Sequence, residues 1–193
     1  MSSSSLKIML VDQDSGRSAI LRQALTDAGH EVVTRVEPGR NLLREVQQSQ
    51  PDIVIVDMEA PGRDTLEQMR EIGRDQPKPI ILFSNKRDGE YIRQAVQAGV
   101  SAYVVDGLSR ERIMPIVEVA MARFREFEAL RQELRDTKNE LADRKVIDKA
   151  KGILMQRKGL SEEDAYKLLR KAAMDRNMRV VEVARTLLAL EGL

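Results

Sequence analysis

The sequence predicts an α/β domain built on a five-stranded parallel sheet, followed by a long central helix and a small module of three helices. Three observations support this prediction. Residues 6–107 alternate short apolar runs with amphipathic stretches, residues 109–143 lack Gly and are dense in Glu, Arg, Leu and Ala, and the chain from residue 144 carries a basic excess. The pattern divides the chain into a domain of residues 6–108, a helix of residues 109–143 and a module of residues 144–193.

Five apolar runs predict the strands of the sheet. Their nearly continuous apolar character suits strands that are covered on both faces, as in a parallel sheet. Amphipathic patterns separate the runs, and Gly29 and Gly99 follow two of these patterns where a left-handed helix cap is expected. Ligands of such sheets bind beyond the carboxyl ends of the strands. The predicted strands are residues 6–11, 31–34, 52–56, 79–84 and 102–105.

The central helix carries an apolar residue at every seventh position, the period of a coiled-coil seam. These positions are Ile113, Ala120, Phe127, Leu134 and Leu141. Four residues further on stand Val117, Phe124, Arg131, Lys138 and Lys145. Because only the first two of this second set are apolar, the apolar pattern of the seam is strong near the start of the helix and weak toward its end. The pattern is typical of a parallel or antiparallel dimer, of a docked partner helix, or of a single long surface helix.

The C-terminal module is basic although the whole chain is almost neutral. Residues 144–193 hold 12 Lys and Arg against 7 Asp and Glu, while the rest of the chain holds 20 against 24. This asymmetry favours a polyanion as the partner of one end, although a solvated helical face also explains such an excess. Gly159 ends the first helix of the module, and Ser161 with Asp164 predicts the N-cap of the second. We expect packing roles for Leu154, Met155, Leu168, Leu169, Met174, Val183 and Leu187.

Composition excludes several classes of protein. There is no Cys among the 193 residues, which excludes disulfides and thiol catalysis and fits a reducing cytoplasm. Neither a secretory signal nor a membrane-spanning apolar run is present, so we expect a soluble, cytoplasmic protein without membrane contact. We expect His30, the sole His, to cap a surface turn. No nucleophile–base pair and no Gly-rich phosphate loop is visible, so we do not expect an enzyme.

Three carboxylates follow strands whose carboxyl ends converge in a parallel sheet. Asp12 and Asp14 follow the first predicted strand, and Asp57 follows the third. Such a cluster offers hard oxygen ligands to Mg²⁺, and the metal can position a phosphoryl donor for attack by one carboxylate. The alternative is that these residues only cap turns and helices.

Residues 6–123 resemble the receiver domain of bacterial response regulators, which has a flavodoxin-like fold. The motifs are Leu10-Val-Asp-Gln-Asp14, Val54-Ile-Val-Asp-Met58, Leu82-Phe-Ser84 and Ala98-Gly-Val-Ser-Ala-Tyr-Val-Val105. The resemblance implies that Asp57 is the phospho-acceptor, that Asp12 is a metal-side carboxylate, and that the Ser84 hydroxyl senses the phosphoryl group.

Two residues depart from the receiver pattern. Gln13 stands in the usual pair of adjacent acids, and Asp106 replaces the Lys that receivers hold after the fifth strand. A carboxylate beside a phosphoryl site reverses a favourable charge interaction. Lys86 of the fourth loop is a candidate substitute for that cation. We therefore predict weak or absent phosphorylation and a receiver that acts as a protein-binding platform.

Residues 146–188 resemble the ANTAR domain, the RNA-binding module of bacterial transcription antiterminators. The matching segments are Ala150-Lys-Gly-Ile-Leu-Met155, Ser161-Glu-Glu-Asp-Ala-Tyr166, Leu169-Arg170, Ala173-Met174 and Arg176. Lys and Arg neutralise phosphates, Arg and Tyr stack on bases splayed out of loops, and Gly allows a close approach of the RNA backbone. The candidate RNA-binding residues are Lys151, Gly152, Arg157, Tyr166, Arg170 and Arg176.

Among regulators with this two-domain plan, the chain is most similar to nitrate-assimilation antiterminators of the NasT type. The resemblance implies binding to paired stem-loops in the 5′ leader of an mRNA, which prevents a terminator hairpin from forming. It also implies control by a nitrate/nitrite-sensing protein related to solute-binding proteins, and a homodimer through the central helix adds bivalency. Amide-type and amine-utilisation regulators share this plan. The alternative from another class is a DNA-binding response regulator, but residues 180–190 are too apolar for a recognition helix.

Overall fold

The computed structural model describes residues 5–12, 15–37, 40–59, 61–105 and 110–190. These residues fall into two compact units, Met1–Glu128 and Ala129–Leu193. Each unit has its own buried core, and the long helix α5 (Arg110–Lys158) contributes to both. No helix in the described part of the chain is both long and apolar enough to cross a membrane.

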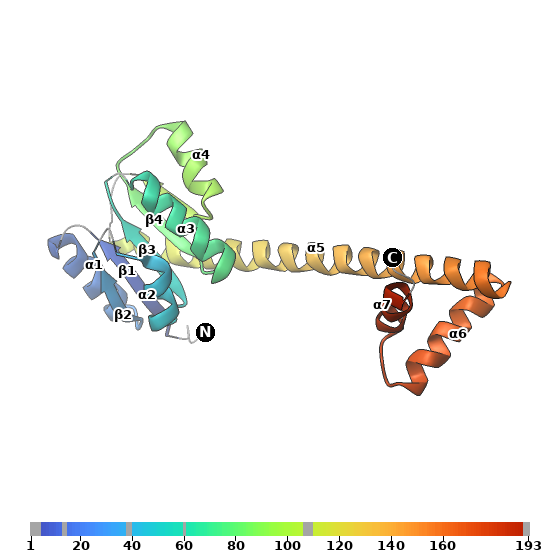
Figure 1. Ribbon diagram of the computed structural model, residues 1–193. Coiled ribbons are helices and arrows are strands. Elements are labelled where there is room, and N and C mark those ends of the chain that lie inside the picture. The colour runs from blue at the N-terminus through green and yellow to red at the C-terminus, as the bar shows by residue number, and fades with distance from the viewer. Residues whose placement is uncertain (1–4, 13–14, 38–39, 60, 106–109, 191–193) are drawn as a thin grey trace. The chain divides into compact units, whose positions relative to one another are not determined.

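The first unit is a five-stranded parallel sheet, as the sequence predicts, and its strand order is β2-β1-β3-β4-β5. The helices between the strands are seen in Figure 1. The strands are β1 (Lys7–Asp12), β2 (Glu31–Val36), β3 (Ile53–Asp57), β4 (Ile80–Ser84) and β5 (Ala102–Val105). The helices that precede α5 are α1 (Ser15–Asp27), α2 (Leu42–Ser49), α3 (Arg63–Asp75) and α4 (Gly89–Gln97).

Successive side chains of the central strands enter opposite cores, because a strand points alternate residues to its two faces. Met9 of β1 and Val54 of β3 lie in a core with α2, α3 and α4. Ile8 and Ile55 lie in the other core, with α1 and the first turns of α5. Both faces are therefore covered, which explains the nearly continuous apolar runs of the sequence.

The glycine caps occur where the sequence predicts them. Gly29 follows α1 with a φ of 86°, and Gly99 follows α4 with a φ of 92°. Both values lie in the left-handed region, which Gly enters without the clash of a Cβ atom. Each cap turns the chain from a helix directly into the next strand.

His30 is buried, so the expectation of a surface turn is wrong. Its side chain is only 5% exposed, and its Nδ1 accepts a hydrogen bond of 3.2 Å from the backbone N–H of Leu6. The imidazole thus ties the connection between α1 and β2 to the start of β1. A lone polar residue between a helix cap and a strand has no sequence pattern that indicates its burial.

The early half of the seven-residue repeat belongs to the core of the first unit and not to a dimer seam. Ile113, Val117 and Ala120 are at most 1% exposed and pack beneath the sheet. Phe127, Leu134 and Leu141 are 55–58% exposed. The expected strength of the early seam therefore reflects packing within the chain, and only the later positions remain exposed.

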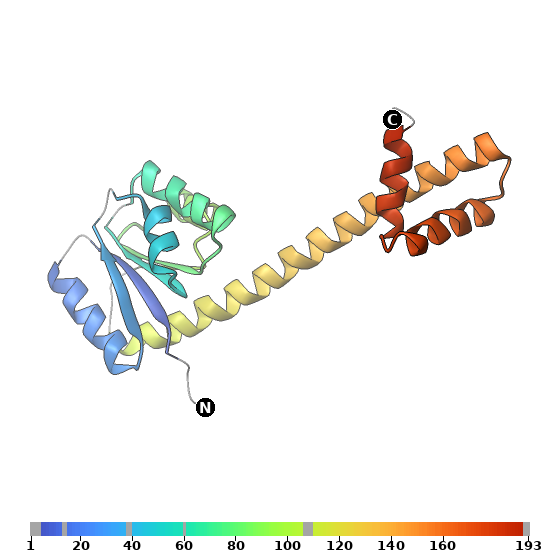
Figure 2. The same ribbon diagram turned by 60° about the horizontal axis from the view of Figure 1, so that its bottom comes forward.

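The second unit consists of the end of α5, α6 (Glu162–Asp175) and α7 (Val180–Leu190), which are seen from a second direction in Figure 2. Ser161 caps α6, since its Oγ accepts a hydrogen bond from the backbone N–H of Asp164. The core contains Leu154, Leu169 and Val183, as expected, and Leu187 packs against it. Leu168, Met155 and Met174 are 38%, 39% and 72% exposed, so the expected packing roles of these three are wrong.

Candidate functional site

Polar side chains gather at the carboxyl ends of three neighbouring strands in the first unit. Asp12 ends β1, Asp57 ends β3, and the two residues are direct partners in the strand register. Ser84 ends β4, and all three are at most 4% exposed. The structure therefore brings together three of the predicted receiver residues. Asp14 and Asp106, which complete that prediction, lie outside the described residues.

Three hydroxyl groups hold the loops that follow β3 and β4. The Ser84 hydroxyl donates a hydrogen bond of 2.8 Å to the Glu59 carbonyl oxygen and accepts one from the backbone N–H of Lys86. The Tyr91 hydroxyl donates to the Pro61 carbonyl oxygen at 2.7 Å, and the Tyr103 hydroxyl donates to the Lys86 carbonyl oxygen at 2.8 Å. Burial, aided by the charge of Tyr103, raises the pKa of Tyr91 to about 12, so its hydroxyl remains a donor at neutral pH.

Lys86, the cation that could substitute for the missing Lys, lies against an aromatic ring. Its Nζ is 4.6 Å from the centre of the Tyr91 ring, a separation typical of a cation–π contact. The rings of Tyr91 and Tyr103 meet edge to face, with their centres 6.3 Å apart. This contact holds Lys86 beside α4.

The carboxylates at the sheet edge fit a divalent cation. Asp12 and Asp57 offer hard oxygen ligands, and the Oδ2 atoms of both are buried. Two buried carboxylates on adjacent strands repel each other, and a cation between them would relieve that repulsion. No group of three or more His, Cys, Asp or Glu side chains suited to a metal is found within the described ranges. Two protein carboxylates still suit Mg²⁺, which commonly keeps several water ligands.

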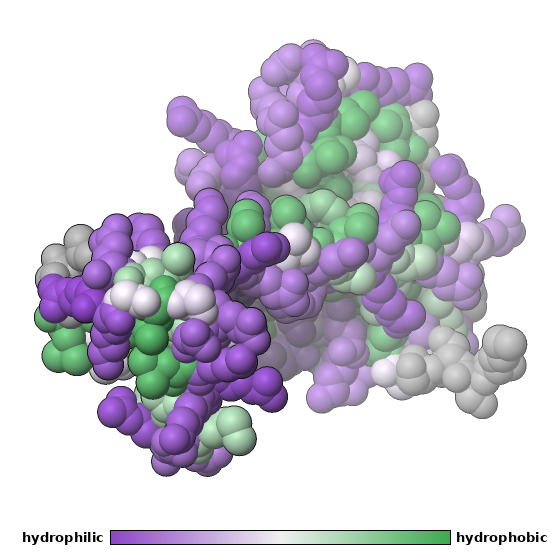
Figure 3. Space-filling model, turned by 90° about the vertical axis from the view of Figure 1, so that its right-hand side faces the viewer, coloured by the Kyte–Doolittle hydropathy of each residue, from purple (hydrophilic) through white to green (hydrophobic). Residues whose placement is uncertain are grey.

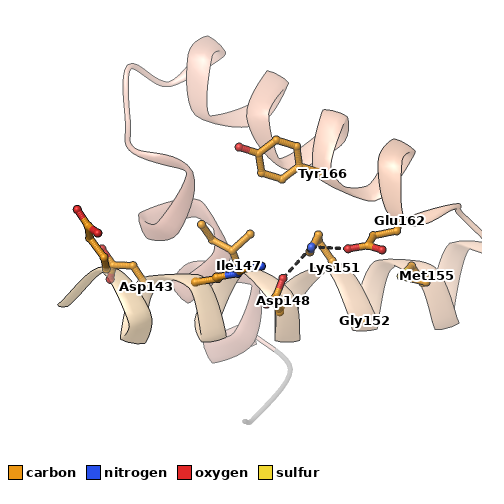
Figure 4. A pocket seen from close by; sticks show the side chains of 10 residues that line it. Asp143, Ile147, Asp148, Lys151, Gly152, Met155, Glu162 and Tyr166 are labelled. Atoms are coloured by element: carbon orange, nitrogen blue, oxygen red, sulfur yellow. Dashed lines mark hydrogen bonds and ion pairs between the residues drawn. The ribbon is translucent and has the colours of Figure 1, made fainter. Parts of the chain in front are cut away.

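The second unit contains a groove of about 640 Å³ between the end of α5 and the start of α6 (Figure 4). The α5 residues that line it recur three or four positions apart, so one face of the helix forms its floor. Three of the predicted RNA-binding residues, Lys151, Gly152 and Tyr166, line this groove together. The other lining residues are Glu140, Asp143, Arg144, Ile147, Asp148, Met155 and Glu162.

Lys151 is bound to two carboxylates within the groove. Its Nζ lies 2.7 Å from Asp148 Oδ1 and 2.7 Å from Glu162 Oε1, and its side chain is only 15% exposed (Figure 4). The hydrogen bonds to Asp148 and then Glu162 raise the pKa of Lys151. The hydrogen bond from Lys151 lowers the pKa of Asp148. Lys151 is therefore charged, but its charge is already balanced within the module.

Two further residues of this groove differ from Lys151. Gly152 leaves open space, and Tyr166 exposes its ring. A Cβ atom built on Gly152 meets no other atom within 4 Å, so packing within the chain does not require a glycine here. Gly within a helix costs about 1 kcal/mol relative to Ala, which suggests that an approaching ligand uses the space. Tyr166 is 42% exposed and offers its ring to that space.

The remaining predicted contact residues lie on the surface outside the groove lining. Arg170 follows Tyr166 by four residues on α6, so the two share one face of that helix. Arg176 caps the C-terminal end of α6, and Arg157 is in the last turn of α5. All three are exposed. The structure therefore divides the candidates into a groove set and a surface set.

The groove is acidic, a property that the cationic residues of the motif do not indicate. Four of its lining side chains are carboxylates and two are cations. Asp143 also binds Arg185 of α7, with 2.6 Å between Oδ1 and Nη2. Helical spacing could have placed Glu140, Asp143 and Asp148 beside Lys151 and Gly152. Glu162 joins this lining only because α6 packs against α5, which helical spacing does not indicate.

Figure 3 shows apolar surface among the hydrophilic side chains of this module, which is nearest the viewer.

Comparison with known proteins assigns both units to families. Residues 8–118 match the response regulator receiver domain, and residues 135–188 match the ANTAR domain. The transcriptional regulatory protein PdtaR of Mycobacterium tuberculosis is 30% identical over 186 residues, which cover 96% of this chain and 91% of that protein. The nitrate regulatory protein of Klebsiella oxytoca is 41% identical over 83 residues, or 43% of this chain and 20% of that protein.

Solved structures support the fold of the first unit. The receiver domain of a diguanylate cyclase from Desulfovibrio desulfuricans superimposes with a TM-score of 0.56 at 21% identity, over 63% of this chain and 98% of that domain. The family matches, the relative that spans nearly the whole chain, and the paired acids at the sheet edge agree with one another. This chain belongs to the response regulators that combine a receiver domain with an ANTAR domain, a family that is regulatory rather than enzymatic.

Proposed function

We propose that this protein is a signal-regulated transcription antiterminator that acts in the cytoplasm. It binds paired stem-loops in the 5′ leader of an mRNA and prevents the terminator hairpin from forming. In this proposal residues 6–108 receive the signal and residues 144–193 bind RNA. Residues 109–143 connect these two parts and form the homodimer contact. The observation that carries the proposal is the groove of the ANTAR module, which the exposed Tyr166 ring and the open position at Gly152 line together.

The acidic lining of the groove determines which part of an RNA enters it. Carboxylates repel phosphates, so the sugar–phosphate backbone does not lie along the groove floor. An unpaired base carries no charge, and aromatic side chains stack on bases splayed out of loops. We assign to Tyr166 the role of stacking on such a base. Gly152 leaves room for the RNA to approach α5 closely. Phosphate contacts belong to the exposed Arg157, Arg170 and Arg176, with Lys151 at the edge of the base.

The receiver acts in this proposal as a protein-binding platform with weak or absent phosphorylation. Asp106 stands where receivers hold a Lys, and Lys86 lies against Tyr91. Asp12 and Asp57 would hold Mg²⁺, and Asp14 is the third ligand of this proposal. Bound Mg²⁺ would neutralise the carboxylates and favour an incoming phosphoryl oxygen. Asp57 is the phospho-acceptor of this proposal. The Ser84 hydroxyl, which donates a hydrogen bond to the Glu59 carbonyl oxygen, is the group that would respond to a phosphoryl group on Asp57.

We propose nitrate or nitrite assimilation as the regulated process. The similarity to the nitrate regulatory protein of Klebsiella oxytoca supports this assignment. The partner of the receiver is a nitrate/nitrite-sensing protein related to solute-binding proteins, which holds the regulator inactive until the anion binds. A homodimer through α5 would then present two RNA-binding modules to the two stem-loops.

Binding of the purified chain to a two-stem-loop leader RNA tests the proposal. We expect specific binding that loop mutations abolish and that Arg170→Ala weakens at least 10-fold, about the effect of losing one strong charged contact. Lys171→Ala is the matched control, since it removes the same charge from the next position of α6. Equal, steeply salt-dependent binding to every RNA would contradict the proposal, and preference for the matching DNA duplex would favour a DNA-binding regulator.

A further inference from the structure

Helix α5 carries a row of exposed cations that lie outside the candidate RNA-binding residues. Four basic side chains follow one another at intervals of three, seven and four residues, and all four are exposed. At about 100° per residue, these intervals place them within an arc of about 80° around the helix and along a length of about 21 Å. This row is the basic stripe, and its members are Arg135, Lys138, Lys145 and Lys149.

Four acidic side chains of the same part of α5 lie on the other side of the helix. They also occupy an arc of about 80°, and its centre is about 160° from the centre of the basic stripe. A helix face that is only solvated typically alternates charges of both signs, whereas a face of one sign attracts a polyanion. The acidic residues are Glu133, Asp136, Glu140 and Asp143.

The cations of the basic stripe are not neutralised within the chain. Its three lysines take part in no ion pair with another described residue. Asp148, three residues after Lys145, is bound instead to Lys151. Arg135 donates a hydrogen bond of 2.9 Å to the side-chain oxygen of Gln132, an uncharged partner that does not balance the guanidinium charge. Four positive charges are therefore available to an anionic ligand.

Gly152 connects the basic stripe to the groove of the ANTAR module. It follows Lys149 by three residues and Lys145 by seven, so the three residues share one side of α5. Gly152 also lines the groove, and the space at its missing Cβ atom is open. An RNA whose base enters the groove can therefore cross α5 at Gly152 and reach the stripe.

We propose that the basic stripe binds the sugar–phosphate backbone of a double-stranded RNA stem below the loop that enters the groove. This inference rests on the RNA-binding function proposed above. A duplex carries the phosphates of two strands, so a row of cations releases more counterions from it than from a single strand. Sites for single-stranded RNA usually add aromatic side chains on which bases stack. Residues 128–165 contain no aromatic residue, so the stripe offers contacts to phosphates and not to bases.

The two surfaces then have separate roles in RNA binding. Contacts to the phosphate backbone position a nucleic acid and add affinity, but they carry no information about its sequence. The groove selects the loop, and the stripe strengthens the binding of any loop that is carried on a stem long enough to reach it.

Binding to hairpins that share one loop tests the proposal. One hairpin has a short, stable stem, and a second has the same stem extended by several base pairs. A third has the short stem with a single-stranded extension that contains the same number of phosphates. We expect the full-length wild-type chain to bind the second hairpin most tightly. No gain from the longer stem, or an equal gain from the single-stranded extension, would overturn the proposal.

Lys145→Gln/Lys149→Gln removes two charges of the stripe and keeps side chains that favour a helix. We expect this variant to lose the gain from the longer stem. The slope of log affinity against log salt should become shallower by about two, so between about 50 and 200 mM salt its affinity should change roughly 10-fold less than that of the wild type. Lys167→Gln/Lys171→Gln is the matched control, since it removes two exposed lysines of the same spacing from α6. The control should keep the gain, and equal losses in the two variants would overturn the proposal.

Loop mutations separate this inference from the proposed function. If they abolish binding by the wild type while both lysine variants depend equally on stem length, the stripe assignment is wrong and the loop-binding function stands. If they leave binding by the wild type unchanged, the proposed function fails, and this inference fails with it.

Discussion

Lys151 lies within hydrogen-bonding distance of two carboxylates, and this arrangement limits what its charge contributes to RNA binding. Asp148 is on the same helix, whereas Glu162 is in the first turn of α6. A phosphate near Lys151 must compete with both acids. A cation in an ANTAR motif therefore does not count as a free phosphate contact until its neighbours are known.

Removal of Glu162 should leave Lys151 with one carboxylate partner, Asp148, and make its charge more available to RNA. Glu162→Gln keeps the size of the side chain and removes its charge, so we expect RNA binding to tighten by about two- to fivefold, the range of an exposed ion pair. The dependence of affinity on salt should also steepen, because one more cation reaches a phosphate. Filter binding across a salt series measures both effects.

Glu163→Gln is the matched control, since Glu163 pairs with Lys167 outside the groove lining. It removes the same charge from the adjacent residue. Equal tightening by the two variants would show a general electrostatic effect and would contradict a specific role for the pairing of Lys151.

Asp57 should accept a phosphoryl group slowly or not at all. A cation normally balances the phosphoryl charge at such a site, and Asp106 offers a negative charge instead. Incubation with acetyl phosphate and Mg²⁺, followed by intact mass measurement, should show little added mass. Asp106→Lys should increase the labelling, and Asp57→Asn should abolish any that occurs. Rapid, stable labelling of the wild-type chain would contradict this prediction.

At the scale of the elements, the sequence was sufficient for the strands, the caps and the class of fold. Strands covered on both faces leave apolar runs, and Gly29 and Gly99 are needed for a left-handed backbone. The C-terminal module was less predictable. Met174 has an apolar side chain but is 72% exposed, because its position on α6 faces away from the core. Helical periodicity identifies one buried face only when the contact partners of the helix are known.

The candidate RNA-binding groove shows the same limit. Lys151, Gly152 and Tyr166 were found from the motif, and they do line one groove. The ion pair of Lys151 with Glu162 joins residues on two helices, so it depends on how those helices pack and not on local pattern. The burial of His30 depends likewise on a contact with a residue 24 positions away.

The N-cap of α6 should stabilise the groove wall. The Ser161 hydroxyl accepts a hydrogen bond from the Asp164 N–H at 3.2 Å and donates one of 2.7 Å to Asp164 Oδ2. Ser161→Ala leaves a helix donor without its partner, so we expect the free energy of unfolding of this module to fall by about 1 kcal/mol. Urea denaturation followed by far-ultraviolet circular dichroism measures the change. Ser161→Thr keeps a capping hydroxyl and should recover most of the loss, and equal stability of the two variants would argue against the cap.

For the whole molecule, the proposed dimer should convert two weak RNA contacts into one strong interaction. Once one module is bound, the second stem-loop is held at a high effective concentration, so a tandem RNA should bind on the order of 100-fold more tightly than a single stem-loop. Leu130→Asp/Leu134→Asp places charges at two exposed apolar positions of α5 and should remove this gain while single-loop affinity stays unchanged. Competition binding with single and tandem RNAs measures both quantities. Equal affinity of the wild type for the two RNAs would mean that the modules act separately.

The carboxylates of the groove should also weaken binding to the bulk of cellular RNA. Ribosomal and transfer RNA present mostly paired bases behind continuous phosphates, and such surfaces meet repulsion at the groove although the neighbouring arginines attract them. Only a strand that turns an unpaired base outward escapes this penalty. The acids then function as a filter, and neutralising them should raise affinity for transfer RNA more than affinity for the leader. The same side chains that weaken the protein as a general polycation would thereby keep it available for a rare transcript.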